Sequence, residues 1–265
     1  MTGARLKVRL QFSERNRFRE DVTPRMRTLS NVSLVAVATV EVDAIIKALE
    51  YSSRGIYFGR TILFSNSTSM LKQSAIEHVH IEKFMNVGEW GKFIVFELHK
   101  HITTSHIMLI HADGFVVNPE AWSDEFLQYD YIGAPWPLPR DSYSYRDYFG
   151  NIIRVGNSVS LRSQKLLKLP SDLGLTWSGE HGFLHEDGFL CVQNRHILQQ
   201  HGIKYAPLSV ACRFAHETPL RETQGIVPFA FHKWKGPNRK YPRFTVKQDR
   251  IVRAIKKVLR SWSLV

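Results

Sequence analysis

The chain has 265 residues, of which 43% are hydrophobic and 23% are charged, a composition typical of a folded globular protein. A chain of this length buries about three quarters of its unfolded surface, so its core requires no disulfide or structural metal. The formal net charge of +12 favours anionic partners such as nucleotide phosphates, nucleic acid or acidic lipid. Charge alone does not choose among these partners.

Cysteine usage and hydropathy point to a reducing compartment. Cys191 and Cys212 lie in apolar surroundings without metal-ligand spacing, which predicts reduced core thiols, with a disulfide between them as the alternative. No stretch approaches the ~20 consecutive apolar residues of a membrane span, and residues 1–10 lack the apolar core of a signal peptide. We therefore expect a cytoplasmic protein.

The sequence divides into three parts. Residues 1–30 are rich in arginine and poor in large apolar side chains, so they predict a basic peripheral arm. Residues 31–244 carry the strand and helix patterns of one α/β domain. In residues 245–265, the segment 249–262 has apolar residues on one side and basic residues beside them, which predicts an amphipathic helix. This helix either packs on the domain or lies on the anionic inner face of a membrane.

The first elements of the domain alternate between strands and helices. Residues 32–40 form a continuous β-branched apolar run, which is typical of a strand buried on both faces of a parallel sheet. Residues 43–54 predict a helix and 61–65 a second strand, which together make a right-handed βαβ unit. Residues 79–84 predict a third strand, and 89–101 have the apolar spacing of a helix.

The next buried strand, 106–110, runs directly into His111-Ala112-Asp113-Gly114, so polar groups appear where an apolar strand ends. In the second half, residues 129–136 and 155–161 are strand-like, and 183–194 carry a Glu-Asp pair before a predicted helix. The fold class is therefore α/β with a mainly parallel central sheet. Ligands of such sheets bind at the carboxyl edge, where we expect Thr39, Asp113 and a turn at Gly156.

Two features suit a diphosphate bridged by a divalent cation. Asp113 offers a carboxylate ligand at the end of a strand and precedes a flexible glycine, although an Asp-Gly pair there is often only a turn. Gly156, Asn157 and Ser158 offer small side chains and open backbone amides for a sugar or phosphate, or else form a tight turn.

Two more features suit acid–base and ligand chemistry. Glu186 and Asp187 are adjacent carboxylates beside a glycine; catalysis is one interpretation, and helix N-capping by Asp187 is the other. His232 lies among aromatic residues, where it is either a metal ligand or a core histidine.

In this order the motifs resemble those of GT-A glycosyltransferases and, more narrowly, a bacterial glycosyltransferase-like family of largely unassigned function. The resemblance covers about residues 30–244. The motifs that carry it are His111-Ala112-Asp113-Gly114-Phe115, Tyr131-Ile132-Gly133-Ala134-Pro135-Trp136, Gly156-Asn157-Ser158-Val159-Ser160-Leu161-Arg162, His185-Glu186-Asp187-Gly188 and Phe231-His232-Lys233-Trp234.

The resemblance implies a GT-A-like, Rossmann-like catalytic domain that binds a nucleotide sugar and Mn²⁺ or Mg²⁺. Asp113 matches the second acid of the family's Asp-x-Asp motif and would ligate the metal, together with His232, which matches the late histidine of such enzymes. His111 replaces the first acid, so its contact with metal, ribose or neither stays open. Thr39 and Lys92 would lie near the nucleotide.

The catalytic roles are implied in the same way. Asp187 matches the carboxylate that deprotonates the acceptor hydroxyl in inverting members, and Glu186 would hold acceptor or donor hydroxyls. The implied reaction moves a hexose from a nucleotide diphosphate sugar, with UDP favoured, to a saccharide or lipid-linked saccharide. Inversion is expected, retention stays open, and bacterial surface polysaccharide synthesis is the implied context.

Two other classes of protein fit the sequence less well than a glycosyltransferase. A basic nucleic-acid-binding protein would need its charge on one face, whereas here the basic residues concentrate at both ends and no nucleic-acid motif is present, so we expect no nucleic acid partner. A metal-dependent hydrolase could use His111, His185 and His232 with Asp113 and Asp187, but the sequence contains no His-Glu-x-x-His motif.

Overall fold

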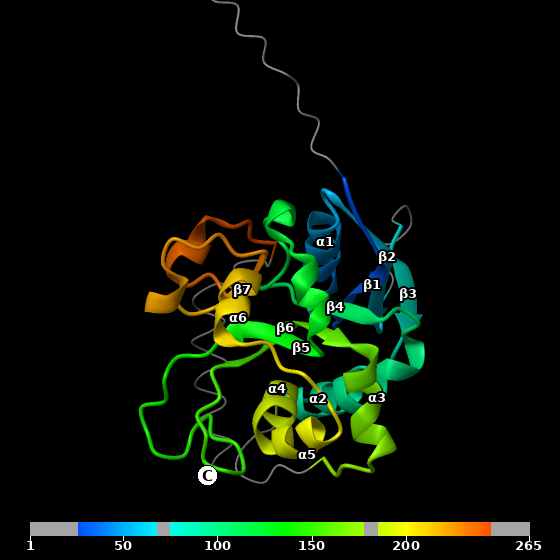
Figure 1. The fold of residues 1–265 in the computed structure, drawn as a ribbon. Helices are drawn as coiled ribbons and strands as arrows, with labels where there is room; N and C mark the ends of the chain where they lie inside the picture. The colour runs from blue at the N-terminus through cyan, green and yellow to red at the C-terminus, as the bar shows by residue number, and fades with distance from the viewer. Residues whose placement is uncertain (1–25, 68–74, 178–184, 245–265) are drawn as a thin grey trace, which may run out of the picture.

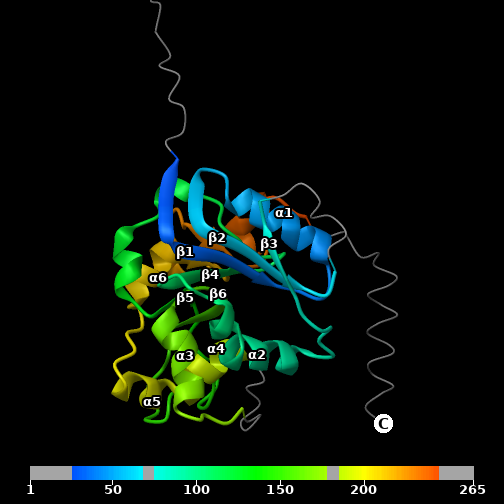
Figure 2. The same ribbon diagram turned by 90° about the vertical axis from the view of Figure 1, so that its right-hand side faces the viewer.

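The computed structural model describes residues 26–67, 75–177 and 185–244, which form a sheet covered by helices on both faces (Figures 1 and 2). The predicted C-terminal helix and most of the basic arm lie outside these residues. The main sheet has six strands in the order β3-β2-β1-β4-β6-β5, and β7 and β8 form a separate pair. Its strands are β1 (Arg27–Val37), β2 (Ile56–Ser65), β3 (Glu77–His80), β4 (His106–Ile110), β5 (Tyr131–Pro135) and β6 (Val155–Ser163); the pair is β7 (Ala215–His216) and β8 (Ala230–Phe231).

The pairing confirms the predicted α/β class with a mainly parallel sheet. β3, β2, β1 and β4 are parallel to one another, whereas β6 runs antiparallel to both β4 and β5. β4 has the predicted bounds. β1 begins at Arg27, inside the predicted arm, because its first residues pair with the beginning of β2. The third strand ends at His80, earlier than predicted.

The helices connect and cover the strands. They are α1 (Val42–Ser52), α2 (Val87–Phe96), α3 (Gln164–Asp172), α4 (Glu186–Gly188), α5 (Arg195–Gln200) and α6 (Leu208–Phe214), with short turns η1 (Leu98–His101), η2 (Pro119–Ala121), η3 (Asp124–Gln128), η5 (Phe189–Gln193), η6 (Arg221–Thr223) and η7 (Gly236–Lys240). The start of α2 is fixed by a reciprocal cap, in which Asn86 accepts from the Glu89 amide at 3.0 Å and Glu89 accepts from the Met85 amide at 2.7 Å. The predicted helix 89–101 is thus α2 followed by the tighter turn η1.

Successive side chains along the central strands point to opposite faces of the sheet, and both faces are apolar. Leu34 and Ala36 of β1 face the core that contains α1 and α6, and Val35 and Val37 face the core that contains α2 and Leu167 of α3. Figure 2 shows α1 above the sheet and α2 and α3 beneath it. The continuous apolar run that predicted β1 therefore reflects burial on both faces.

The predicted turn at Gly156 is wrong, because Gly156 lies within β6. Since β6 is antiparallel to β4, with Leu109 opposite Ser160, residues 156–158 still lie beyond the carboxyl end of β4. This beginning of β6 is packed closely. A Cβ atom on Gly133 would lie 1.7 Å from the Gly156 carbonyl oxygen, and one on Gly156 would lie 2.0 Å from the Trp136 ring.

Cys191 and Cys212 are free and buried, as predicted. Burial raises the pKa of the Cys191 thiol to about 12, so it packs as an apolar side chain. Within the described ranges, no helix has the length and apolarity needed to cross a bilayer.

Gly133→Ala should destabilise the protein, because the new methyl group meets backbone rather than a movable side chain. We expect a loss of about 1–3 kcal/mol in the free energy of unfolding, measured by urea denaturation. Gly88→Ala is the control, since that glycine lies in α2 and a Cβ there would meet only the Asn86 side chain at 3.1 Å. Equal unfolding midpoints for the two variants would contradict the close packing of β5 on β6.

Candidate active site

A pocket of about 410 Å³ lies at the carboxyl ends of β1 and β4 and contains three of the predicted site residues. Thr39 follows β1, and His111 and Asp113 follow β4. The beginnings of α1 and α2 complete the walls, and the residues that line the pocket are 37–41, 45, 84–87, 90 and 111–113. The predicted carboxyl edge of the sheet therefore carries a pocket, and Thr39 and Asp113 both line it.

Trp90 of α2 forms a flat wall of this pocket. Its indole nitrogen donates to the Val37 carbonyl at 2.9 Å, and its ring centroid lies 5.3 Å from that of His111. These contacts fix the half-buried indole, which therefore presents a preorganised aromatic face to the pocket.

Asp113 and His232 meet at the mouth of the pocket. Oδ1 of Asp113 lies 3.5 Å from Nε2 of His232, which follows β8. Gly114 permits this approach, because a Cβ atom there would lie 2.8 Å from the His232 ring and 2.6 Å from the Val159 side chain. The backbone of Lys233 adds a second link by donating to the Asp113 carbonyl at 2.7 Å.

The charges around Asp113 keep it ionised. Burial alone would raise its pKa, but the hydrogen bond and charge of His232, followed by the charges of His111 and Lys233, lower the pKa of Asp113 to about 2. Burial, followed by the charge of His232, lowers the pKa of His111 to about 4. His111 is therefore neutral at pH 7, and its Nε2 has no hydrogen-bond partner among the described residues.

The donor set at this point fits a hard divalent cation. A permanently ionised carboxylate and an imidazole nitrogen face each other, and such a cation often takes only one or two protein ligands beside phosphates and water. The described residues contain no group of three histidine, cysteine, aspartate or glutamate side chains placed to hold a metal by themselves. The geometry thus suits a metal that arrives with a phosphate ligand.

Glu217 joins two elements of the site. Its carboxylate accepts from Nζ of Lys233 and from Nδ2 of Asn157, both at 2.7 Å, and Lys235 lies 3.5 Å away. Burial alone would raise the pKa of Glu217, but the hydrogen bond from Lys233 and the charges of His232 and the two lysines lower it. Glu217 also raises the pKa of Lys233, against the effect of burial, and Asp113 and Asp187 add to that rise. Lys233 therefore stays protonated between these carboxylates.

Glu186 and Asp187 occupy opposite environments although they are adjacent. Glu186 is fully buried and pairs with Nη2 of Arg162 at 2.9 Å; despite burial, Arg162 lowers the pKa of Glu186. Asp187 is partly exposed, and its pKa is raised by burial and then by the charge of Glu186. One carboxylate therefore anchors α4 on β6, and the other can exchange a proton near neutral pH.

The other predicted residues are placed less favourably for ligand contact. Lys92 is exposed on α2 and does not line the pocket. Gly156 packs on Trp136, and Asn157 is buried against Glu217, so both support the site from behind. Ser158 remains partly exposed. Glu186 has no exposed side-chain surface through which a substrate hydroxyl could reach it.

Three residues near the site have roles that the sequence did not predict: Trp90, Glu217 and Lys233. Trp90 was recognisable only as part of an apolar helix, and Lys233 only as a member of the Phe231-His232-Lys233-Trp234 motif. Lys233 adopts a left-handed conformation with φ of 62°, which the sequence did not predict. Glu217 carries no local signal, because its partners lie in distant segments.

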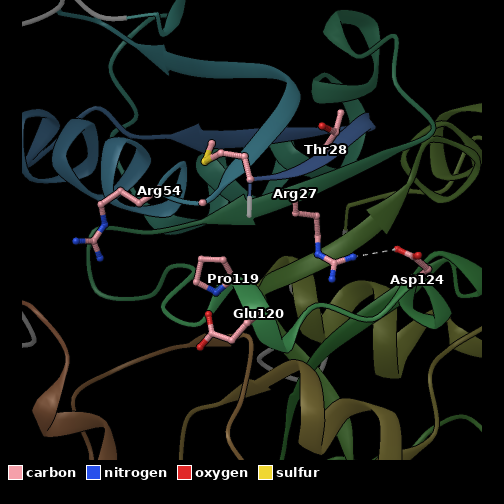
Figure 3. A pocket seen from close by; sticks show the side chains of 8 residues that line it. Arg27, Thr28, Arg54, Pro119, Glu120 and Asp124 are labelled. Carbon is pink, nitrogen blue, oxygen red and sulfur yellow. Dashed lines mark ion pairs between the residues drawn. The ribbon is translucent and has the colours of Figure 1, made fainter. Parts of the chain in front are cut away.

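A larger hollow of about 990 Å³ lies at the other end of β1 and is drawn in Figure 3. It is lined by Met26, Arg27, Thr28, Arg54, Gly55, Pro119, Glu120 and Asp124. Arg27 faces Asp124 across it at 3.9 Å, and Arg54 stacks on Tyr51. Its opposite charges offset each other and none of the predicted site residues lines it, so we do not place the chemistry there.

Comparison with known proteins gives a family and a partial likeness to solved structures. The sequence model of a family described as "Protein of unknown function (DUF5672)" matches residues 76–232. No curated protein matches the chain.

Two solved structures resemble the chain in part. The bifunctional IspDF of Campylobacter jejuni is 11% identical, with a TM-score of 0.41, and the match covers 66% of this chain and 48% of that one. The mannosyltransferase PcManGT of Pyrobaculum calidifontis, in complex with GDP-Man and Mn²⁺, is 12% identical, with a TM-score of 0.41 and coverage of 70% and 56%. The chain spans about half the length of these structures, and the likeness is too low to carry an argument about the site.

Glu186→Ala should destabilise the protein strongly, because it leaves the Arg162 guanidinium buried without its counter-charge. We expect a loss of about 3–5 kcal/mol in the free energy of unfolding by urea denaturation. Glu125→Ala, which breaks the exposed ion pair with Arg213, is the control and should cost about 1 kcal/mol or less. A Glu186→Ala variant as stable as the control would show that this pair does not anchor α4.

Proposed function

The chain belongs to the DUF5672 family, whose description states no activity, and from the site we propose that it is a metal-dependent glycosyltransferase. It transfers a hexose from a nucleotide diphosphate sugar, with UDP favoured as the nucleotide, to a saccharide or lipid-linked saccharide. The anomeric centre inverts in a single displacement. The setting that we propose is bacterial surface polysaccharide synthesis.

One observation carries this proposal. The Asp113 carboxylate lines a pocket with an aromatic wall and lies 3.5 Å from the His232 imidazole, and Lys233, next in the chain, is within electrostatic reach of Asp187, a carboxyl group of raised pKa. An enzyme that uses a nucleotide diphosphate sugar needs three such features: a surface for the nucleoside, a charged centre for the diphosphate and a base for the acceptor. The electrostatic link of Lys233 to both Asp113 and Asp187 supports their belonging to one site.

Each end of the donor has a counterpart among the residues. We assign the nucleoside to the pocket beside Trp90 and Thr39, where the indole face suits a planar base. Asp113 and His232 would hold Mn²⁺ or Mg²⁺, which when bound neutralises charge on the diphosphate. His111 keeps an unpaired ring nitrogen beside this point and can hydrogen-bond ribose or phosphate.

The chain's own residues then perform two tasks. Asp187 accepts the proton of the acceptor hydroxyl as that oxygen forms its bond to the anomeric carbon. The bond from the anomeric carbon to the phosphate oxygen breaks, and its electron pair leaves with the diphosphate. Lys233, held protonated beside Glu217, lies where it can stabilise that growing negative charge.

Glu186 has a supporting role in this scheme instead of binding a hydroxyl. Its charge raises the pKa of Asp187, and its ion pair with Arg162 fixes the backbone from which Asp187 projects. The metal-dependent hydrolase stays a weaker alternative, because the described residues hold no zinc-like cluster of three ligands.

UDP or GDP with Mn²⁺ should raise the melting temperature of the protein, since a ligand that binds only the folded state stabilises it. Asp113→Ala should abolish this shift, read from the variant's own ligand-free melting temperature, because the lowered pKa of Asp113 means that its charge also stabilises the folded state. Asp124→Ala, an exposed aspartate at the other end of the sheet, is the matched control and should keep the shift. A nucleotide-dependent shift that survives in Asp113→Ala, or in EDTA, would refute the metal assignment.

The rate of transfer should depend on the protonation of Asp187. Burial and the charge of Glu186 raise its pKa to about 7, and only the ionised carboxylate can accept a proton. The rate constant kcat should therefore rise with pH up to a plateau above about pH 7, in a profile measured with saturating donor and acceptor.

Asp187→Asn removes this base and should lower kcat by about 10²- to 10⁴-fold on the plateau above pH 7, with a smaller ratio at lower pH, where Asp187 is already protonated, and with KM for the donor little changed. Asp124→Asn serves again as the control. A variant Asp187→Asn that retains full transfer would assign the base to another residue.

A further inference from the structure

The connection between β5 and β6 displays an unusual number of exposed apolar side chains. Tyr143, Tyr148 and Phe149 are 76%, 74% and 67% exposed, and Leu138 and Ile152 are exposed beside them in the sequence. Figure 1 shows this connection, in green, extending away from the sheet below β5 and β6. Exposed apolar patches of this kind mark binding surfaces more often than chance.

Internal hydrogen bonds hold the connection in one shape. The Asp141 carboxylate accepts from the amides of Tyr143 and Ser144, and the Asp147 carboxylate accepts from the amides of Phe149 and Asn151. The Ile153 amide closes the connection by donating to the Tyr145 carbonyl at 2.6 Å. The aromatic side chains are therefore displayed by an ordered backbone.

Tyr148 and Phe149 are further fixed by His196 of α5. The rings of Tyr148 and His196 are stacked with centroids 4.5 Å apart, and the Phe149 ring lies 6.0 Å from the same imidazole. Tyr148 and Phe149 remain mostly exposed, as does Tyr143 of the same connection, and we define these three residues as the aromatic platform.

Tyr145 connects this platform to the candidate base. Its ring centroid lies 4.9 Å from that of Trp136, with the two rings tilted, and its backbone adopts a left-handed conformation with φ of 54°. Burial, followed by the charges of Glu217 and Asp187, raises the pKa of its hydroxyl. The Trp136 ring in turn packs on Gly156, whose neighbour Asn157 binds Glu217, so the connection that carries the platform adjoins the site on the side of β6, where we place the acceptor.

We propose that the aromatic platform is a subsite for the sugar rings of the acceptor, which presents its hydroxyl to Asp187. The proposal rests on the proposed function. One face of a pyranose carries several C–H bonds and packs on the negative face of an aromatic ring, while its hydroxyls reach water or polar neighbours. Two of the three platform residues are tyrosines, and Arg146 and Asp147 lie in the same connection, so apolar faces stand beside polar groups, as a saccharide requires.

The test measures saccharide binding and donor-side binding separately. The probes are methyl glycosides of glucose, galactose, mannose, rhamnose, N-acetylglucosamine and N-acetylgalactosamine, observed by saturation-transfer NMR. The proteins are the full chain, the double variant Tyr148→Ala with Phe149→Ala, the single variant Tyr143→Ser, and Tyr57→Ala. Tyr57 is the matched control, because it is 62% exposed on β2, away from the connection.

We expect at least one saccharide to bind the full chain and the control equally. The double variant should bind it about tenfold more weakly, and Tyr143→Ser should weaken binding in the same direction. The thermal shift by UDP or GDP with Mn²⁺ should be unchanged in all four proteins, because the platform does not line the nucleotide pocket.

Other results overturn the proposal. One is the absence of saturation transfer to every saccharide, and another is unaltered saccharide binding in both platform variants. A third is that the full chain and the Tyr57→Ala control sediment with phosphatidylcholine–phosphatidylglycerol vesicles while the platform variants do not, which would assign the platform to a membrane. Should the double variant not fold, Tyr143→Ser decides. Loss of the nucleotide shift in the full chain refutes the proposed function instead, whatever the saccharides do.

Discussion

The geometry of the site depends on one fully buried ion pair, Arg162 with Glu186. Arg162 lies in β6 and Glu186 in α4, so the pair joins the sheet to the segment that carries Asp187. Nε of Arg162 also donates to Ser160 at 2.8 Å, which restrains the guanidinium. Two buried charges are expensive to desolvate, and their attraction offsets that cost only when both remain in place. The pair therefore specifies where α4 sits more than it adds to stability. Gly91 lets α2 lie close to both Trp177 and α4, because a Cβ there would lie 2.8 Å from the Trp177 ring and 3.5 Å from the Glu186 backbone nitrogen.

Much of the fold was predictable from sequence, and the contacts of the site were not. The strand 106–110 was found with its bounds because a strand buried on both faces has a continuous apolar run. The turn assigned to Gly156 failed because the small residues reflect contact with Trp136 and Gly133, which local sequence does not reveal. Glu217 was missed for a related reason: its partners, Asn157 and Lys233, come from β6 and from the end of β8, so only the folded chain makes the cluster.

Backbone strain in the described residues concentrates around the same cleft. Four residues other than glycine have left-handed conformations: Glu41, Tyr145, Asn157 and Lys233. Glu41 lines the pocket beside Trp90, Asn157 and Lys233 bind Glu217, and Tyr145 packs on Trp136. Such conformations cost about 1–3 kcal/mol each and persist only where the surroundings enforce them. Their clustering favours a functional cleft independently of any motif. It also points to Tyr145 and Lys233 as functional residues, which their positions in the sequence alone do not.

The two carboxylates proposed for the chemistry are separated by environment as well as by position. Asp113 is surrounded by His232, His111 and Lys233, so its pKa falls to about 2 and it carries a permanent charge suited to a cation. Asp187 lies beside the ionised Glu186 in a poorly solvated place, so its pKa rises towards neutrality and it can take up and release a proton. Two acids with pKa values pushed in opposite directions favour a division of roles between ligand and base. Lys233 lies within electrostatic reach of both, and a diphosphate leaving the metal side would compete with Glu217 for its charge. In the proposed reaction the cleft would couple departure of the diphosphate to the electrostatic field at Asp187, because any movement of Lys233 towards the phosphates would change the charge near that carboxylate.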